Sequence, residues 1–370
     1  MVEWKKLGDI CEIKGRIGFR GYTRDDQVSK GEGAISLSPG NIIEGSLSFD
    51  SCTYITWAKY TESPEIMVSE GDIILGKTAS VGKVARIKNL PEKATINPQL
   101  VLLKQFKLNP QYLFYILSDS PFQNKIKGLA GIGSVPNVSQ AKLSQILIPI
   151  ISDSEQERIV GILDTFTSSI DNLKQQIVQR RKQYEYYRDQ LLDLEGKEGV
   201  EMKKLEETCE IRRGIRVVKK QLKDNALYPV FQNSIAPMGY YDQFNRDGNI
   251  PYIICAGSSS GSVGYCCTPF WAADDCFTIE SSKVNIRYTY YALKKNNNNL
   301  FKLVRKGSMP RLPHEAIDNM IIPIPSISEQ QRIVDILDKF EASIQNLESQ
   351  LSQREKQYEY YRNKLLTFEE

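Results

Sequence analysis

Lys77 and Thr78 end the stretch GDIILGKT (71–78), which fits the pattern G-x-x-x-x-G-K-[ST] of a nucleotide-binding P-loop. In a P-loop the lysine contacts the terminal phosphates, the hydroxyl binds Mg²⁺, and backbone N–H groups at a helix N-terminus cradle the phosphate. A true match would therefore predict an ATP-binding protein.

The elements around this stretch do not suit that chemistry. Ile73, Ile74 and Leu75 occupy the positions where a P-loop needs an open turn, and three consecutive aliphatic residues favour a strand. The following ASVGKVARI (79–87) alternates apolar residues around Gly82, which predicts a hairpin and not the helix that a P-loop requires. We expect a strand and hairpin here, and no ATP binding.

No other group of residues forms a recognisable catalytic or metal site. The chain has one histidine, His314, which we expect in a loop, and seven scattered cysteines without a C-x-x-C pair. We expect reduced, mostly packed thiols, no metal site, no catalytic residues and no cofactor bound by this chain.

The 370 residues have a globular composition, with 41% hydrophobic and 25% charged residues, and their number predicts two or three domains. No apolar run approaches the ~18 residues of a membrane span, and residues 1–14 lack the apolar core of a signal peptide. We expect a cytoplasmic protein without a membrane partner.

An internal repeat organises the chain. Residues 148–195 return as residues 322–369, with about 31 of 48 positions identical and no gap. A weaker repeat precedes each copy: VEWKKLGDICEI (2–13) matches VEMKKLEETCEI (200–211), and GSVPNVS (133–139) matches GSMPRLP (307–313). The organisation is A–B–A′–B′, in which B is nearly copied and A has diverged.

Each B segment has the heptad pattern of one long helix. Ser154, followed by acidic residues, is a candidate N-cap, and apolar residues then recur at steps of three and four, as in a coiled coil. The predicted seam residues are Leu163, Phe166, Ile170, Leu173, Ile177, Arg180, Tyr184, Tyr187 and Leu191 in B, and Leu337, Phe340, Ile344, Leu347, Leu351, Arg354, Tyr358, Tyr361 and Leu365 in B′.

These two helices most simply pair with each other, antiparallel, which gives the chain a pseudo-two-fold axis. The seam arginines, Arg180 and Arg354, either set the register or extend out of the seam toward solvent. The heptad spacing of the tyrosines favours helix packing over base stacking. Tyr186 and Tyr360 lie off the seam and are available to a partner.

The A segments are predicted to be α+β. Residues 70–87 and 97–104 are expected to form strands, residues 109–129 one helix, and the asparagine run 296–299 a solvated loop. The full prediction is an α+β chain with globular parts at 1–150 and 197–324 and helical parts at 151–196 and 325–370.

The globular and helical parts differ in the sign of their net charge. Residues 1–150 and 197–324 carry net charges of +4 and +5, whereas residues 151–196 and 325–370 carry −3 each. Two basic units held at a fixed spacing on a pseudo-dyad suit duplex DNA, whose phosphates attract Lys and Arg.

The candidate DNA-binding residues are basic or hydroxyl side chains in glycine-containing loops, and each of them could contact a base, a phosphate or only solvent. They are Lys14, Arg16, Arg20, Arg24, Lys77, Thr78, Ser80 and Lys83 in A, and Arg212, Arg213, Arg216, Lys219, Lys220, Ser258, Ser259, Ser260, Lys306 and Arg311 in A′.

The duplicated motifs carry a family resemblance. Two variable units, each closed by G-S-x-P-x…I-P-I and E-Q-x-R-I-V-x-I-L-D and followed by a helix ending QYEYYR-x-x-LL, resemble the specificity (S, HsdS) subunit of type I restriction-modification enzymes. The resemblance spans the chain. It implies two target-recognition domains (1–150 and 197–324), each reading half of a split, asymmetric double-stranded DNA target, and two conserved helical regions (151–196 and 325–370) that set the half-site spacing.

The resemblance also implies partners. Two methyltransferase (M) subunits dock on the helices and restriction (R) subunits join them, while S-adenosylmethionine, ATP and Mg²⁺ belong to those subunits and this chain is non-catalytic. A methylation-only system is an alternative within the same family. The alternative from another class is a coiled-coil scaffold that binds protein partners without DNA recognition.

Overall fold

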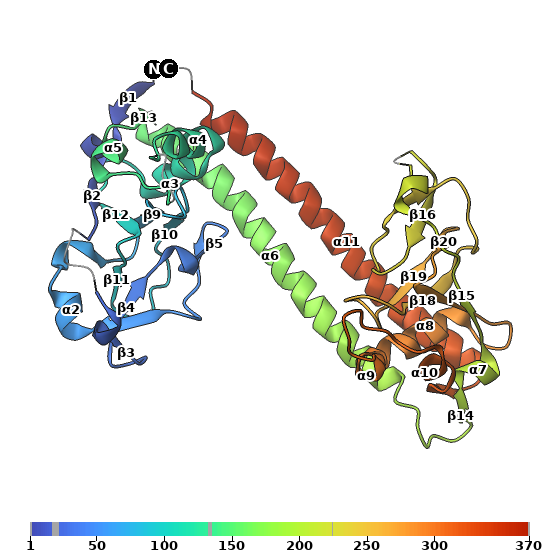
Figure 1. Cartoon of the computed structure of the whole chain (residues 1–370). Coiled ribbons are helices and arrows are strands. Elements are labelled where there is room, and N and C mark those ends of the chain that lie inside the picture. The colour runs from blue at the N-terminus through green and yellow to red at the C-terminus, as the bar shows by residue number, and fades with distance from the viewer. Residues whose placement is uncertain (1, 17–21, 132–134, 224, 369–370) are drawn as a thin grey trace. The chain divides into compact units, whose positions relative to one another are not determined.

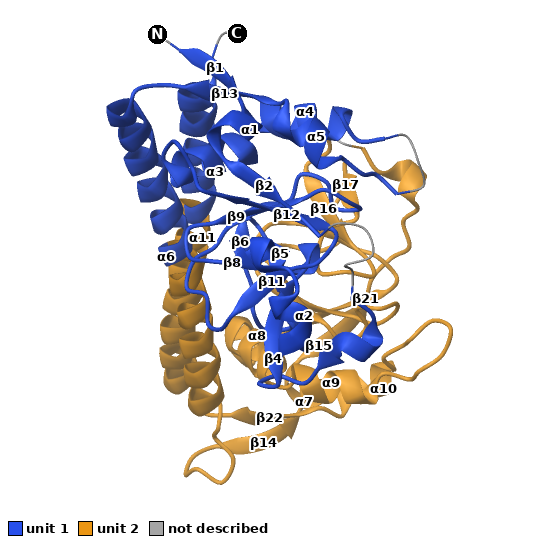
Figure 2. Cartoon of the chain, turned by 90° about the vertical axis from the view of Figure 1, so that its left-hand side faces the viewer, with its two compact units in different colours: residues 1–172, 351–370 blue, residues 173–350 orange. Residues whose placement is uncertain are grey.

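The structure of the chain is a computed structural model that describes residues 2–16, 22–131, 135–223 and 225–368. It divides into two compact units (Figure 2). Unit 1 comprises residues 1–172 and 351–370, and unit 2 comprises residues 173–350. Each unit therefore contains one globular part and a portion of both long helices.

The central element of unit 1 is an antiparallel four-stranded sheet that includes the stretch GDIILGKT. Ile73–Leu75 are fully buried, because the sheet is covered on both faces, and this explains their unbroken aliphatic run. The strands, in sheet order, are β10 (Val84–Arg86), β9 (Ile73–Gly76), β12 (Leu100–Lys104) and β2 (Glu12–Lys14).

A second sheet of unit 1 mixes parallel and antiparallel pairs, and a small hairpin lies beside it in the sequence. The sheet strands, in order, are β3 (Gln27–Val28), β7 (Thr53–Thr56), β4 (Gly33–Leu37), β11 (Ala94–Ile96) and β8 (Met67–Val68), and the hairpin is β5 (Ile42–Ile43) and β6 (Ser46–Leu47). Short helical turns connect them: η2 (Arg24–Asp26), η3 (Pro39–Asn41), α2 (Trp57–Thr61) and η4 (Pro64–Ile66).

The remaining elements of unit 1 close the fold. They are β1 (Glu3–Lys6), α1 (Leu7–Ile10), α3 (Pro110–Ser118), α4 (Ser120–Gly128), α5 (Gln140–Ser144) and β13 (Leu147–Ile150), where β1 and β13 pair antiparallel. The prediction of one helix over 109–129 is wrong. Asp119 has extended backbone angles, and Pro121 follows it, so the chain breaks there and starts a new helix.

Unit 2 repeats this frame. Its four-stranded sheet has the equivalent strand order: β19 (Val263–Cys266), β18 (Ile250–Ile254), β21 (Cys276–Glu280) and β15 (Glu210–Arg213). As β1 pairs with β13 in unit 1, β14 (Glu201–Lys204) pairs with β22 (Ile321–Ile324) in unit 2. Its second sheet has only three strands: β17 (Gly239–Tyr241), β16 (Tyr228–Phe231) and β20 (Trp271–Ala272). The helical elements are α7 (Leu205–Thr208), η5 (Lys219–Gln221), α8 (Ile286–Lys295), α9 (Asn297–Leu303) and α10 (His314–Asp318).

Two loop predictions in unit 2 are wrong. The asparagine run belongs to α9 from Asn297 on, because the fully buried Leu300 packs that segment against the core. His314 is the first residue of α10, where its Nδ1 lies 2.8 Å from Oδ2 of Asp318.

The long helices are α6 (Asp153–Leu191) and α11 (Ile327–Leu366), labelled in Figure 1. Helix α6 begins at Asp153, so Ser154 lies inside the helix and is not its N-cap. Within each unit, one end of α6 lies antiparallel to a portion of α11. The fold class is thus α+β, with two β-rich parts and packed long helices, as expected.

Equivalent contacts occur in the two helix pairs. In unit 1 the ring of Phe166 stacks on Tyr361 at 5.3 Å, and in unit 2 Phe340 stacks on Tyr187 at 5.4 Å. The guanidinium of Arg354 lies over Phe166, and that of Arg180 lies over Phe340. The two predicted seam arginines therefore cover aromatic rings in the same way.

The other predicted seam residues differ in burial. Tyr187 and Tyr361 are among the exposed ones, although both stack on phenylalanine. Buried are Leu163, Ile170, Ile177, Tyr184 and Leu337, and partly exposed are Leu173, Leu191, Ile344, Leu347, Leu351, Tyr358 and Leu365.

The E-Q of each helix motif fastens the helix to its globular part. Gln156 and Gln330 are both 1% exposed. Oε1 of Gln156 accepts from the backbone N–H of Asn109 at 2.9 Å, and Oε1 of Gln330 accepts from that of Asn285 at 2.9 Å. Because Asn109 and Asn285 are the N-caps of α3 and α8, a buried amide fixes the same helix start in both units.

Candidate nucleic-acid interface

The GKT stretch forms a loop between β9 and β10, as expected for a hairpin. Ala79 and Gly82 have positive φ angles of 61° and 94°, and the chain then enters strand β10. No helix follows the loop, so it lacks the N-terminal helix dipole and the free N–H groups of a P-loop. The N–H groups of Lys77 and Thr78 instead donate to the carbonyl of Gln99.

The loop is held by the segment that contains Pro136. The N–H of Ala79 donates to the carbonyl of Pro136, the N–H of Val138 donates to the carbonyl of Lys77, and Thr78 and Asn137 form a β-bridge. The Thr78 hydroxyl donates to Oδ1 of Asn137 at 2.8 Å. This exposed hydroxyl–amide pair was not predicted from the sequence, although Asn137 is the last residue of the repeated G-S-x-P-x motif.

Unit 2 builds the same bridge with other side chains. The N–H of Gly257 donates to the carbonyl of Pro310, the N–H of Leu312 donates to that of Cys255, and Ala256 pairs with Arg311. Gly257 has a φ of 89°, like Ala79 in unit 1. The Arg311 side chain is 59% exposed, and its guanidinium lies 3.9 Å from Asp275.

The other candidates of unit 1 have different surroundings. Arg16 is only 4% exposed and its Nε donates to the carbonyl of Ile96 at 3.0 Å, and burial lowers its pKa. Lys83 donates to the carbonyls of Pro39 and Ile42, which ties the hairpin to the turn before β5. Both cations therefore bind backbone carbonyl groups of the fold.

Lys14 is partly exposed, and Arg24 is exposed. Lys14 lies on edge strand β2 and forms an ion pair with Glu12 at 3.1 Å, while Arg24 is exposed in η2. Lys77 and Ser80 are partly exposed beside the bridge, and burial lowers the pKa of Lys77. Arg20 lies outside the described residues.

The candidates of unit 2 form two groups. Arg212 is paired with Glu210 and Glu280, and Nε of Arg213 donates to the carbonyl of Asp274 at 2.8 Å. Further exposed candidates lie in the following segment and near the bridge: Arg216, Lys219, Lys220, Ser258, Lys306 and Arg311. Ser259 is partly exposed, whereas Ser260 is 3% exposed and thus unavailable to DNA in this conformation.

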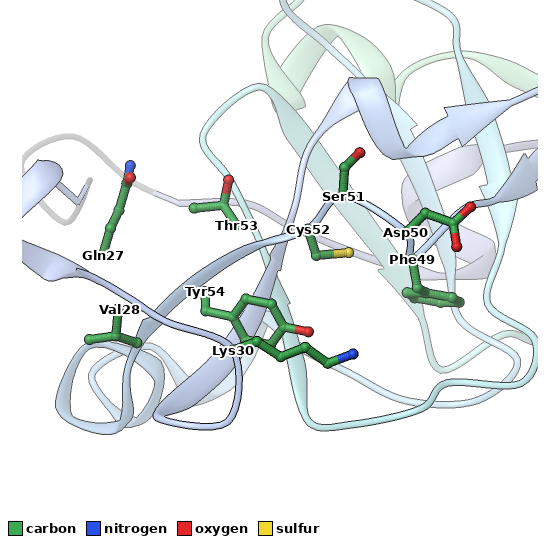
Figure 3. A pocket seen from close by; sticks show the side chains of 9 residues that line it. All are labelled: Gln27, Val28, Lys30, Phe49, Asp50, Ser51, Cys52, Thr53 and Tyr54. Atoms are coloured by element: carbon green, nitrogen blue, oxygen red, sulfur yellow. The ribbon is translucent and has the colours of Figure 1, made fainter.

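A hollow of about 440 Å³ lies in unit 1. Its lining comes from the β3 segment and from the stretch leading into β7, and includes Lys30, Asp50 and Cys52 (Figure 3). None of the predicted site residues lines it.

Metal and membrane sites are not apparent in the described part of the chain. No group of three His, Cys, Asp or Glu side chains there is arranged to hold a metal ion. None of its helices is both long enough and apolar enough to cross a bilayer.

The chain contains two copies of one α+β fold, and the bridge loop of each copy carries different side chains. Both copies are joined to long helices. This architecture defines a class of two-module recognition proteins. The chain belongs to the family of the type I restriction modification DNA specificity domain, whose sequence model matches residues 1–180 and 197–354. It is a DNA specificity subunit of a type I restriction-modification system, and such subunits are the non-catalytic parts of those enzymes.

Relatives and solved structures agree with this family. A type I specificity subunit of Haemophilus influenzae is 30% identical over 297 residues, covering 71% of this chain and 73% of the relative. The EcoR124I/EcoR124II specificity subunit of Escherichia coli is 29% identical, covering 63% and 65%. The S subunit of Mycoplasma genitalium has a similar fold, with a TM-score of 0.70 at 16% identity over 100% of this chain and 97% of that one.

Proposed function

We propose that each globular part reads one half of a bipartite, asymmetric double-stranded DNA target. The supporting observation is the bridge itself: the same backbone hydrogen bonds hold Thr78 to Asn137 in unit 1 and Ala256 to Arg311 in unit 2, while the side chains differ. One frame with two side-chain sets suits two different half-sites, because base edges are distinguished by donor and acceptor pattern.

The proposed recognition domains are residues 1–150 and 197–324, and the helical regions are residues 151–196 and 325–370. The helical regions set the half-site spacing and dock two methyltransferase subunits, which the repeat of residues 148–195 as residues 322–369, with about 31 of 48 positions identical, supports. Tyr186 and Tyr360 are equivalent in the repeat, 59% and 62% exposed, and each packs edge-to-face on the next tyrosine. Exposed aromatic side chains of this kind are frequent anchors of protein interfaces.

The complex acts in the cytoplasm, with restriction subunits added to the methylating core. S-adenosylmethionine, ATP and Mg²⁺ are bound by the partner subunits. The DNA contacts of this chain come from the exposed and partly exposed candidates, among them Lys14, Arg24, Lys77, Arg216, Lys219, Lys220, Lys306 and Arg311.

The test is a map of modified bases in the genome of a methylation-free host that carries this chain with its methyltransferase partner. A host with the partner alone is the control. A new bipartite, asymmetric methyladenine motif that requires this chain supports the proposal. No motif, with both proteins expressed and complexed, would instead favour the scaffold alternative.

A further inference from the structure

The bridge of each unit belongs to a four-residue site whose members correspond one to one. We call it the bridge site: Thr78, Gln99, Gly131 and Asn137 in unit 1, and Ala256, Asp275, Arg305 and Arg311 in unit 2. The correspondence follows from backbone hydrogen bonds. Gln99 accepts from the N–H of Lys77 as Asp275 accepts from that of Cys255, and Asn137 accepts from the N–H of Gly131 as Arg311 accepts from that of Arg305.

The chemistry of the bridge site differs at every position. Unit 1 offers an uncharged set of one hydroxyl and two amides, whereas unit 2 offers two arginines and one carboxylate. Since the backbone hydrogen bonds that define the bridge site correspond in the two units, we attribute this difference to what the side chains bind.

The arginine pair in unit 2 needs a physical explanation. Arg305 and Arg311 exchange both backbone hydrogen bonds, at 2.8 and 3.1 Å, as directly opposed residues of an antiparallel pair do. Their side chains therefore leave the bridge on the same face, and like charges placed directly opposite each other are destabilising. A ligand on that face that is negatively charged or accepts hydrogen bonds, such as a phosphate or the O6/N7 edge of guanine, would relieve the repulsion between the two arginines.

We propose that Asn137 and Arg311 are equivalent base-reading residues, Asn137 for an adenine in one half-site and Arg311 for a guanine in the other. An asparagine amide pairs with N6 and N7 of adenine, and a guanidinium fork pairs with O6 and N7 of guanine. The Thr78 hydroxyl occupies one lone pair of Asn137 Oδ1 and orients the amide, and the Asp275 carboxylate orients Arg311 from one side. Arg305 then contacts the neighbouring phosphate.

This inference rests on the proposed function, and its test uses the same methylation map with four variants. Arg311→Gln removes the charge, Arg311→Lys keeps the charge but loses the fork, and Asn137→Ala removes the amide. The matched control is Lys302→Gln, which removes an exposed cation of α9 outside the bridge site. The half-site that a variant does not touch reports whether the protein has folded and assembled.

We expect both Arg311 variants to relax one fixed guanine, with discrimination falling about 10- to 100-fold, and to leave the other half-site unchanged. Asn137→Ala should relax one fixed adenine in the other half, and Lys302→Gln should leave the motif intact.

An unaltered motif in all variants overturns the inference while leaving the proposed function standing. So does a methylation level that falls equally at all sites in Arg311→Gln but stays normal in Arg311→Lys, with the motif itself unaltered, because that pattern describes a phosphate contact. If the unmodified chain directs no motif, the proposed function fails first and the inference falls with it.

Discussion

Arg287 on α8 and Asp338 on α11 form an ion pair in which Nε lies 2.8 Å from Oδ1. The same guanidinium contacts Glu341 at 2.6 Å and lies over the ring of Tyr265 at 4.3 Å. At the equivalent place in unit 1 the amide of Gln111 donates to Asp164 at 3.0 Å. Each globular part is thus fastened to its helix through the aspartate of the repeated I-L-D, but with a cation in only one of these two contacts.

Arg287→Gln should destabilise unit 2, because it leaves Asp338 and Glu341 close together without their cation. Burial lowers the pKa of Arg287, but the hydrogen bond to Asp338 and the nearby negative charges raise it overall. We expect a loss of about 1–3 kcal/mol, since the carboxylates are partly exposed. Hydrogen exchange of the α8 amides measures it locally. Arg332→Gln, which breaks an exposed pair with Glu329, is the control, and equal effects of the two changes would contradict the prediction.

The stacked rings of the helix pairs predict matched effects of matched substitutions. Phe166→Ala and Phe340→Ala each remove a ring that stacks on a tyrosine and lies beneath an arginine. We expect both to cost about 1–3 kcal/mol, and to agree within about 1 kcal/mol. Urea unfolding followed by helix dichroism provides the measurement. If the two substitutions lowered the free energy of unfolding by very different amounts, the equivalent stacks of the two helix pairs would not contribute equally to stability.

Lys77→Met should stabilise the protein at neutral pH while weakening DNA binding. Burial lowers the pKa of Lys77, so the folded state disfavours its charge. That penalty is fully present below the lowered pKa and disappears as the pH rises toward the ordinary lysine value near 10.5. The gain should therefore be small at pH 7, below about 0.5 kcal/mol because the group is partly solvated, and absent above pH ~10.5. Thermal unfolding at pH 7 and pH 10.5 tests the sign, and a gain that grows with pH would refute it.

Tyr186→Ala and Tyr360→Ala should weaken assembly with the methyltransferase subunit and leave the fold intact. Both rings are mostly exposed, so their loss removes little internal packing. Exposed aromatic anchors commonly contribute about 2 kcal/mol or more to an interface, which corresponds to roughly 30-fold in affinity. Sedimentation or calorimetric titration with the partner measures this. Tyr240→Ala, an exposed tyrosine on β17, is the control, and unaltered affinity in the helix variants would remove these rings from the proposed interface.

Repeats and periodicity made much of the fold predictable. The aliphatic run Ile73–Leu75 correctly predicted a strand, because a strand buried on both faces needs such a run. The heptads likewise indicated the long helices. Local composition gave a wrong prediction where tertiary packing determines the secondary structure. The asparagine run was expected to be a loop, but it is helical from Asn297 on because Leu300 is buried.

The candidate site was harder to predict, because charge alone does not show what a side chain contacts. Arg16 looks like a surface cation in the sequence, but it is buried, donates to the carbonyl of Ile96 and lies over the ring of Tyr22. Asn137 carries no charge and was overlooked, since its contact is with Thr78, which lies 59 positions earlier. Which exposed candidates contact DNA stays a prediction.

The pairing of β1 with β13, and of β14 with β22, makes each globular part enter and leave its sheet at neighbouring positions. Because the two ends of each globular part lie side by side, the residues between them form one unit that can be exchanged for another. We call this exchangeable unit a cassette. The splice points lie on short antiparallel ladders whose hydrogen bonds are made by backbone atoms and do not depend on the cassette. New pairs of recognition modules could therefore be assembled by cutting within these ladders, with Gln156 and Gln330 retained to accept from whichever helix N-cap replaces Asn109 or Asn285.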